Sequence, residues 1–364
     1  MLRYFFALIL LAHGLIHFMG FAKAFNYGNI TQVTKNISKP AGTIWLITAL
    51  LFIISVSLFL FKKDWWWIGF PAILFSQVLI FMVWKDAKFG TIANILALLV
   101  AVPAYADWKF SRNYHKETTA LLAKAVKSPL VIVNKEMLKG LPPPVQRWLE
   151  RSGIVGKEMI HKIEITQSGE IKQKPGAKWF PFKAKQYNTT DPPAFAWKAQ
   201  IHPSPLMFID GRDKYEEGRG NMLVKPFALF TAANAKGVET DQGSMLRYLG
   251  EIGWFPSAAL NNYIRWEPVD WLSAKATMTY GGITASGIFH FNADGDITGF
   301  EAMRYYVRDK GKTSLERWVV TILPGAYKEF EGIRIPSGIE VAWKLDRGDF
   351  TWLKLEMEEV RYDE

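Results

Sequence analysis

Four apolar segments of 18 to 20 residues occupy the first 108 residues, and this feature most constrains the fold. An α-helix of that length crosses a hydrocarbon layer about 30 Å thick. The opening segment is 20 residues long, contains His13 and His17, and is followed by three more apolar segments, so we do not interpret it as a removable signal peptide. We expect four transmembrane helices, at Leu2–Phe21, Gly42–Phe61, Trp65–Trp84 and Thr91–Trp108.

Residues 1–108 are therefore predicted to form a four-span transmembrane bundle. Short connections favour an antiparallel up-and-down arrangement, and four spans place both termini on one membrane face. Tryptophans beside basic residues, as at Lys62–Trp67, are typical of membrane interfaces. Six basic residues flank the spans on one face of the membrane and five on the other. This leaves undetermined which face carries the soluble remainder of the chain. We expect a multi-pass protein of the cell membrane.

Polar residues inside the predicted spans require an explanation because they are costly in lipid. His13 and His17 are four residues apart and so lie on one helix face. We interpret them as hydrogen-bonding to Ser76 and Gln77 of a neighbouring span, which would hold the helices together. A functional polar cluster, such as a proton relay, and a metal or haem site are the alternatives left open. No metal is predicted.

Composition excludes several classes of function. The chain has no cysteine, which excludes disulfides, iron–sulfur clusters and cysteine nucleophiles. Its net charge is +10, and residues 1–107, with eight Lys and Arg and three Asp, account for half of it. Basic flanks of apolar segments suit anionic lipid headgroups, and there is no Lys/Arg-rich stripe for nucleic acid. We predict a lipid bilayer as partner, no nucleic acid and no cofactor.

Residues 109–144 read as a linker with a short amphipathic helix and a proline run, and residues 145–364 as a soluble, mainly antiparallel β (α+β) domain. A period of two predicts seven strands, within 162–167, 194–202, 274–280, 287–291, 299–307, 314–322 and 338–344. Turns are expected at Asp210-Gly211, Asp294-Gly295, Glu331-Gly332 and Arg347-Gly348. One helix is predicted at Gly243–Ile252, so a curled half-barrel with one or two helices fits the pattern.

No catalytic signature is present: GxSxG, GxxxxGK[ST], HExxH and GxGxxG are all missing, and no catalytic residue is predicted. One cluster near the predicted helix is the candidate ligand-binding site. Its members are Glu239, Asp241, Gln242, Arg247, Tyr248, Glu251, Trp254 and Phe255. In the functional interpretation Arg247 clamps an anionic group. In the structural one Asp241 caps the helix and Arg247 pairs with Glu251.

Six strings are distinctive when taken together. They are HGLIHFMGF (13–21), WKDAKFGTIANI (84–95), LPPPVQRWLERSG (141–153), GRDKYEEGRGNM (211–222), ETDQGSMLRYLGEIGWFPSA (239–258) and RIPSGIEVAWKL (334–345). The chain resembles a bacterial family of uncharacterised membrane-anchored proteins, and that resemblance implies no activity. The soluble half is also loosely similar to the half-barrel of LolA-type lipoprotein carriers, which encloses an apolar cavity for acyl chains.

The favoured function is a non-catalytic, membrane-anchored module that binds a lipid or another hydrophobic ligand. Aromatic residues in the soluble half would line a concave apolar site beneath the sheet. A structural or signalling protein that binds another membrane protein is the first alternative. The second is an enzyme that acts on lipid-linked substrates through the acidic residues and Arg247.

Overall fold

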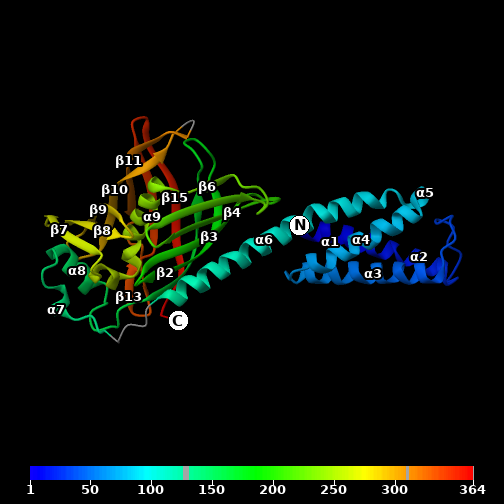
Figure 1. Ribbon diagram of the computed structural model, residues 1–364, viewed down its shortest axis with the longest axis horizontal. Helices are drawn as coiled ribbons and strands as arrows, with labels where there is room; N and C mark the ends of the chain where they lie inside the picture. The colour runs from blue at the N-terminus through cyan, green and yellow to red at the C-terminus, as the bar shows by residue number, and fades with distance from the viewer. Residues whose placement is uncertain (126–130, 309–310, 364) are drawn as a thin grey trace. The chain divides into compact units, whose positions relative to one another are not determined.

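The computed structural model describes residues 1–125, 131–308 and 311–363. The chain forms two compact units, Met1–Arg112 and Asn113–Glu364 (Figure 1). The first unit is helical, and the second is built on one large antiparallel sheet. The predicted linker and β domain also include residues 126–130, 309–310 and 364, which lie outside the described residues.

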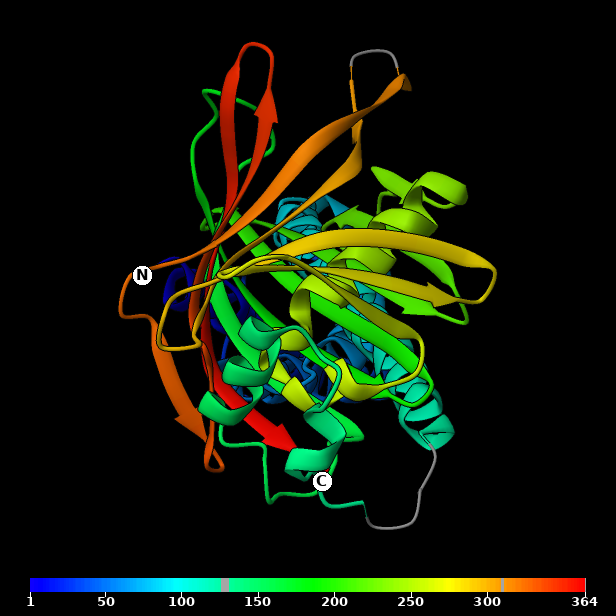
Figure 2. The ribbon, with the colours of Figure 1, turned by 90° about the vertical axis from the view of Figure 1, so that its left-hand side faces the viewer.

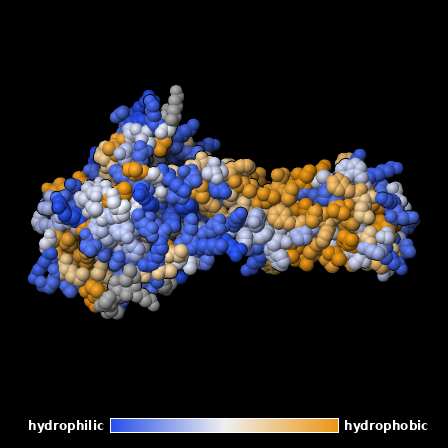
Figure 3. All heavy atoms as spheres, viewed as in Figure 1, coloured by the Kyte–Doolittle hydropathy of each residue, from blue (hydrophilic) through white to orange (hydrophobic). Residues whose placement is uncertain are grey.

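Apolar helices make up the first unit. They are α1 (Leu2–Ile16), α2 (Phe18–Ala24), α3 (Lys39–Leu60), α4 (Trp66–Met82), α5 (Trp84–Ala87) and the start of α6 (Gly90–Lys124). Three helical stretches, 2–24, 39–60 and 90–124, are long and apolar enough to cross a membrane, whereas α4 has 17 residues. Many large hydrophobic side chains of this unit are exposed, and they cover much of the face drawn in Figure 3. A surface of this kind suits contact with lipid.

Small residues allow these helices to pack closely. A methyl group at Gly20 would lie 2.1 Å from the ring of Trp45, and one at Gly42 would lie 2.2 Å from Cβ of Ala24. Close approach through glycine is typical of helix packing in membranes. Helix α6 continues without interruption to Lys124, so the sequence after Trp108 does not form the separate short helix that was predicted. No proline or glycine stands between Trp108 and Lys124 to end the helix.

The second unit is built on a sheet of 13 strands in the described part of the chain. The strands are β1 (Lys162–Ile171), β2 (Phe180–Thr190), β3 (Pro193–Ser204), β4 (Met207–Glu216), β5 (Arg219–Pro226), β6 (Ala233–Ala235), β7 (Ile264–Asp270), β8 (Ser273–Tyr280), β9 (Ile283–Phe291), β10 (Ile297–Val307), β11 (Thr313–Ile322), β14 (Gly338–Leu345) and β15 (Gly348–Tyr362). Their order is β6-β5-β4-β3-β2-β1-β15-β14-β11-β10-β9-β8-β7, and β12 (Tyr327–Phe330) pairs with β13 (Ile333–Pro336) in a separate hairpin.

The helix α9 (Val238–Glu251) connects the two edge strands of this sheet, followed by the short 3₁₀ helices η1 (Ile252–Trp254) and η2 (Pro256–Leu260). It contacts β4 and β5 near one edge and β8, β9 and β10 near the other. One helix can contact both ends of so wide a sheet only if the sheet curls around it. The result is a curled antiparallel half-barrel (Figure 2), as the sequence predicted.

The alternation of apolar residues explains why these strands form. In β1, for example, Ile163 and Ile165 are buried while their neighbours are partly exposed. The short helices α7 (Lys135–Leu138) and α8 (Pro143–Arg151) also belong to this unit, and Trp148 of α8 packs against Phe289 of β9. These residues belong to one continuous hydrophobic core.

All seven predicted strands are confirmed, and three of the four expected turns lie between strands. The turn expected at Asp210-Gly211 is wrong, because both residues lie inside β4. Gly211 has no positive φ, so nothing at this position forces the chain to reverse. The predicted helix begins five residues earlier than expected, at Val238, after Gly237 with φ +106°.

Candidate functional site

A cavity lies between helix α9 and the concave face of the sheet. The cavity has a volume of about 190 Å³. Its wall is mainly apolar and includes the aromatic side chains Trp197, Trp254, Phe300, Trp318 and Trp352. The wall also carries charged side chains, which are Arg212, Asp213, Arg247, Glu251 and Arg304. A concave apolar site with few polar groups is the usual form of a small-molecule site.

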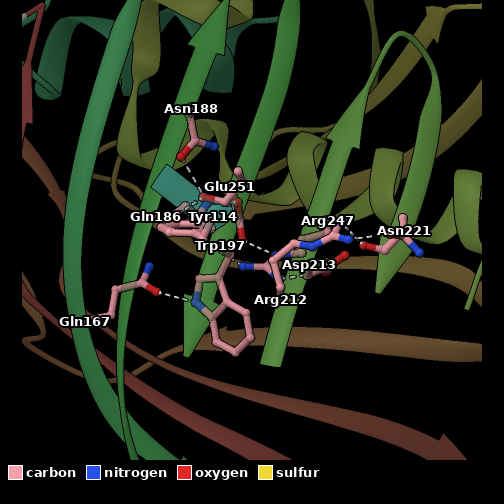
Figure 4. A network of polar contacts seen from close by, with 11 residues as sticks. Tyr114, Gln167, Gln186, Asn188, Trp197, Arg212, Asp213, Asn221, Arg247 and Glu251 are labelled. Carbon is pink, nitrogen blue, oxygen red and sulfur yellow. Dashed lines mark hydrogen bonds and ion pairs between the residues drawn. The ribbon is translucent and has the colours of Figure 1, made fainter. Parts of the chain in front are cut away.

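Arg247 of α9 is held by partners from two strands and from its own helix (Figure 4). Its Nε donates to Oε1 of Glu251 at 2.7 Å, and its Nη1 donates to Oδ2 of Asp213 at 2.8 Å. Its Nη2 donates to Oε1 of Gln186 at 2.9 Å. Burial opposes the charged form, but the two carboxylates outweigh it and raise the pKa of Arg247 above its usual value.

The same guanidinium stacks on aromatic rings. Its Cζ lies 4.7 Å from the ring centroid of Phe195 and 5.0 Å from that of Trp197. Gln186 extends the network by donating to Asn188 at 3.0 Å and to Glu251 at 2.6 Å. Arg247 thus joins α9 to β2 and β4, which is the role of a buried structural ion pair.

Arg304 of β10 also lies in the cavity wall, but its surroundings differ from those of Arg247. Its guanidinium lies 4.8 Å from the ring centroid of Trp318 and against α9, where a methyl group at Gly243 would lie 3.0 Å from its Nε. Among the described residues, Arg304 has no hydrogen-bond acceptor and no carboxylate within 4.0 Å. Burial lowers the pKa of Arg304 to about 10, while the charge of Asp213 opposes this shift and that of Arg247 adds to it.

Some buried polar atoms in the cavity wall also lack partners in the described part of the chain. They are the indole N–H groups of Trp318 and Trp352 and Oδ1 of Asp213. A buried donor or acceptor without a partner costs about 1–3 kcal/mol. Residues of the cavity wall therefore keep polar atoms without a hydrogen-bond partner in the described part of the chain.

The structure separates the eight residues of the predicted site. Three of them, Arg247, Glu251 and Trp254, line the cavity. Tyr248 and Phe255 are buried core residues, and the Tyr248 hydroxyl donates to the carbonyl of Thr189 at 3.0 Å. The predicted surface pair of Arg247 and Glu251 does form, but it is largely buried.

The other three predicted residues hold α9 in place. Glu239 is exposed and accepts from the hydroxyl of Thr313 at 2.6 Å, and Gln242 donates to the carbonyl of Met303 at 3.2 Å. Asp241 does not cap the helix, because the helix starts before it. Its carboxylate accepts instead from Arg219 at 2.9 Å and from the backbone N–H of Gly220 at 2.7 Å.

The sequence interpretation missed Arg304, Asp213, Trp318 and Trp352. A signal for the first was available, since Phe300, Ala302 and Arg304 alternate along one predicted strand. An arginine on the same strand face as buried apolar residues is a charge directed into a core.

The polar residues of the first unit form a network of their own. His13 and His17 each place Nε2 3.0 Å from Oγ of Ser76, and Nε2 of His13 is also 3.0 Å from Oδ1 of Asn94. Asn94 then donates to Oε1 of Gln77 at 3.0 Å. The network links α1, α4 and α6, and it borders a second cavity lined by both histidines. In the described residues no group of three or more His, Cys, Asp or Glu is placed to hold a metal ion.

These features define a class of protein: an antiparallel half-barrel closed by one helix over an apolar cavity, in a chain with apolar helices. The chain belongs to a family of unknown function (DUF6544), whose sequence pattern matches residues 131–355. This confirms the resemblance to a family of uncharacterised proteins.

Solved structures that resemble the chain include the following two. A DUF1329 family protein from Desulfovibrio piger is 12% identical, with a TM-score of 0.36 over 64% of this chain and 94% of that one. A putative outer membrane lipoprotein-sorting protein domain from Vibrio parahaemolyticus is 9% identical, with a TM-score of 0.29 over 56% and 86%. At these scores neither structure carries its function over to this chain. No curated protein matches the sequence.

Proposed function

We propose that this protein is a membrane-anchored module that binds a hydrophobic, lipid-like ligand in the cavity beneath α9, without catalysis. The observation that carries the proposal is the cavity itself, with its mainly apolar, tryptophan-rich wall. In this proposal residues 1–108 are a four-span bundle in the cell membrane, with α4 as the span between α3 and α6. Residues 109–144 connect it to the ligand-binding domain at 145–364.

Gly211 offers a way to fill the cavity without disturbing the fold. It lies on β4 in the cavity wall, and a Cβ added there would approach the ring of Trp197 no closer than 3.6 Å, an ordinary contact. Gly211→Leu therefore places an apolar side chain where the ligand would lie. Lys183→Leu adds the same side chain at an exposed position of the same sheet and serves as the control.

The test is photolabelling of the full chain in a neutral detergent with a long-chain alcohol that carries an alkyl diazirine. We expect saturable labelling of peptides that contain Trp318 and Trp352, unchanged in Lys183→Leu and reduced about tenfold in Gly211→Leu, a difference of about 1.4 kcal/mol. Labelling confined to residues 1–108, or unaffected by Gly211→Leu, would show that the cavity holds no such ligand.

A further inference from the structure

The cations of the cavity wall differ in how they are neutralised. Arg247 donates to two carboxylates and an amide. Arg212 donates to Asn221 at 2.6 Å, and its Nε lies 3.4 Å from Oε2 of Glu117. Arg304 is the exception among the described cations of the cavity wall, since its guanidinium lies over the rings of Trp318 and Trp343 and beside Gly243, with no described carboxylate or hydrogen-bond acceptor as partner.

An arginine has five N–H donors in a planar fork. A ring face attracts the charge but accepts none of these hydrogens in the geometry of a normal hydrogen bond. Burying a cation beside apolar groups is unfavourable unless it is paired and hydrogen-bonded. Arg304 is only partly buried, and none of its nitrogens is among the buried polar atoms without a partner, so its donors are open to the cavity. The acceptors for these donors come from outside the described chain, as water or as a ligand.

A purely structural explanation accounts for only part of this arrangement. Arg247, Asp213 and Glu251 together carry a formal charge of −1, which the charge of Arg304 balances at a distance. Balance at a distance stabilises the cation, but it leaves the hydrogen-bonding capacity of the guanidinium unused. A ligand oxyanion would use that capacity.

We infer that Arg304 binds the oxyanion head, a carboxylate or phosphate, of a single-chain amphiphile whose apolar tail lies against the tryptophans of the cavity. This inference rests on the proposed function and names the chemistry of the ligand. The planar fork of arginine matches a carboxylate or phosphate in a bidentate pair. Gly243 leaves room for the guanidinium beside α9, so the fork can face the cavity without displacing the helix.

The experiment uses diazirine probes of equal chain length with three heads: a carboxylate, a phosphate and an uncharged hydroxyl. The full chain is labelled in neutral detergent at about pH 8, where the anionic heads are ionised and arginine is charged. We expect either or both anionic probes to label cavity peptides about tenfold more efficiently than the alcohol in the unmodified chain. The ratio of carboxylate to phosphate labelling identifies which head the site prefers.

The variants assign this preference to a residue. In Arg304→Gln the anionic probe should label the cavity peptides about as efficiently as the alcohol does. Labelling by the alcohol itself should persist. Arg317→Gln removes an exposed arginine that pairs with Glu301 on the same sheet, and it should keep the preference. Arg304→Lys keeps the charge without the fork and should lose most of the preference, which decides the matter if Arg304→Gln does not fold.

Two results would overturn the inference and leave the proposed function intact. One is equal labelling of the cavity by all three probes in the unmodified chain. The other is an anionic preference that survives in both Arg304 variants. Failure of every probe to label the cavity would instead reject the proposed function, and the inference with it.

Discussion

Gly218 and Gly281 bring together two turns from opposite halves of the sheet. A methyl group at Gly218 would lie 2.8 Å from the Cα of Gly281, so the turns pack backbone against backbone. Gly218 belongs to the turn between β4 and β5, and Gly281 to the turn between β8 and β9. Those hairpins lie near opposite edges of the sheet, and their contact holds the half-barrel curled around α9.

The first prediction tests this contact with Gly218→Ala. Gly218 has φ +77°, so any side chain costs about 1–2 kcal/mol in backbone strain. The clash with Gly281 adds about 1–3 kcal/mol of overpacking. Gly282→Ala is the matched control, because Gly282 has φ +78° but a Cβ added there would meet no atom of the described chain within 4 Å. Thermal unfolding of both variants should show the larger loss for Gly218→Ala; equal losses would mean that the turns do not stabilise the curl.

A second prediction distinguishes a structural from a ligand-binding role of Arg247. Arg247→Lys keeps the charge but has one nitrogen in place of the planar fork, so it cannot keep all three bonds to Glu251, Asp213 and Gln186. Losing a hydrogen bond to a charged group costs about 1.5–3 kcal/mol. We expect a clear drop in melting temperature and unchanged cavity labelling per folded molecule. Arg317→Lys, at an exposed pair, should cost about 0–1 kcal/mol. Normal stability with lost labelling would place Arg247 in the site instead.

Much of the fold could be predicted because alternation and hydrophobic length are local signals. The apolar helices and seven strands follow directly from such patterns. Strand β4 was missed because Asp210-Gly211 resembles a turn, and only the packed sheet shows why a glycine stands there: it faces the cavity beside Trp197. The order of 13 strands depends on contacts distant in sequence, which no local pattern encodes.

The site was predicted only where its residues are close in sequence. Arg247 and Glu251 were paired because four residues separate them on one helix. Asp213 and Arg304 lie far from α9 along the chain, and the curl of the sheet brings them to it. Alternation indicates which face of β10 carries Arg304. That α9 lies opposite this face depends on the tertiary structure and could not be predicted from the strand alone.

A third prediction concerns alkaline pH. Burial raises the pKa of Tyr215, Tyr248 and Tyr263 above the usual value near 10. Between pH 10 and these raised values the unfolded chain has released protons that the folded chain keeps, so stability falls as pH rises. Each tyrosine contributes up to about 1.4 kcal/mol per pH unit. Arg304 has the opposite effect on the change of stability with pH, because its pKa is lowered to about 10. Its effect offsets that of only one tyrosine.

The measurement is the melting temperature of the full chain from about pH 8 to 11, compared with that of Tyr248→Phe. The unmodified chain should be insensitive to pH well below 10 and should lose stability progressively above it. Tyr248→Phe should lower the melting temperature at every pH, because its hydroxyl bonds to Thr189 and Tyr263, and should reduce the alkaline slope. An unchanged slope would contradict a raised pKa for Tyr248.

The last prediction concerns His13 and His17. Both lie 3.0 Å from the hydroxyl of Ser76, and His13 also contacts Asn94. Hydrogen bonds between membrane helices average about 0.6 kcal/mol each, so replacing both histidines with alanine should cost about 2 kcal/mol. Replacement with glutamine should cost less, because an amide both donates and accepts.

The readout is thermal unfolding of the full chain in detergent, with metal content and visible absorption measured on the same samples. Ser57→Ala is the control, because among the described residues the hydroxyl of Ser57 bonds only within its own helix, to the carbonyl of Ile53. If the histidines serve to hold the helices together, the glutamine variant should keep most of the stability that the alanine variant loses. If the glutamine variant instead loses a metal or haem that the unmodified chain carries, the pair is a ligand site rather than a structural contact.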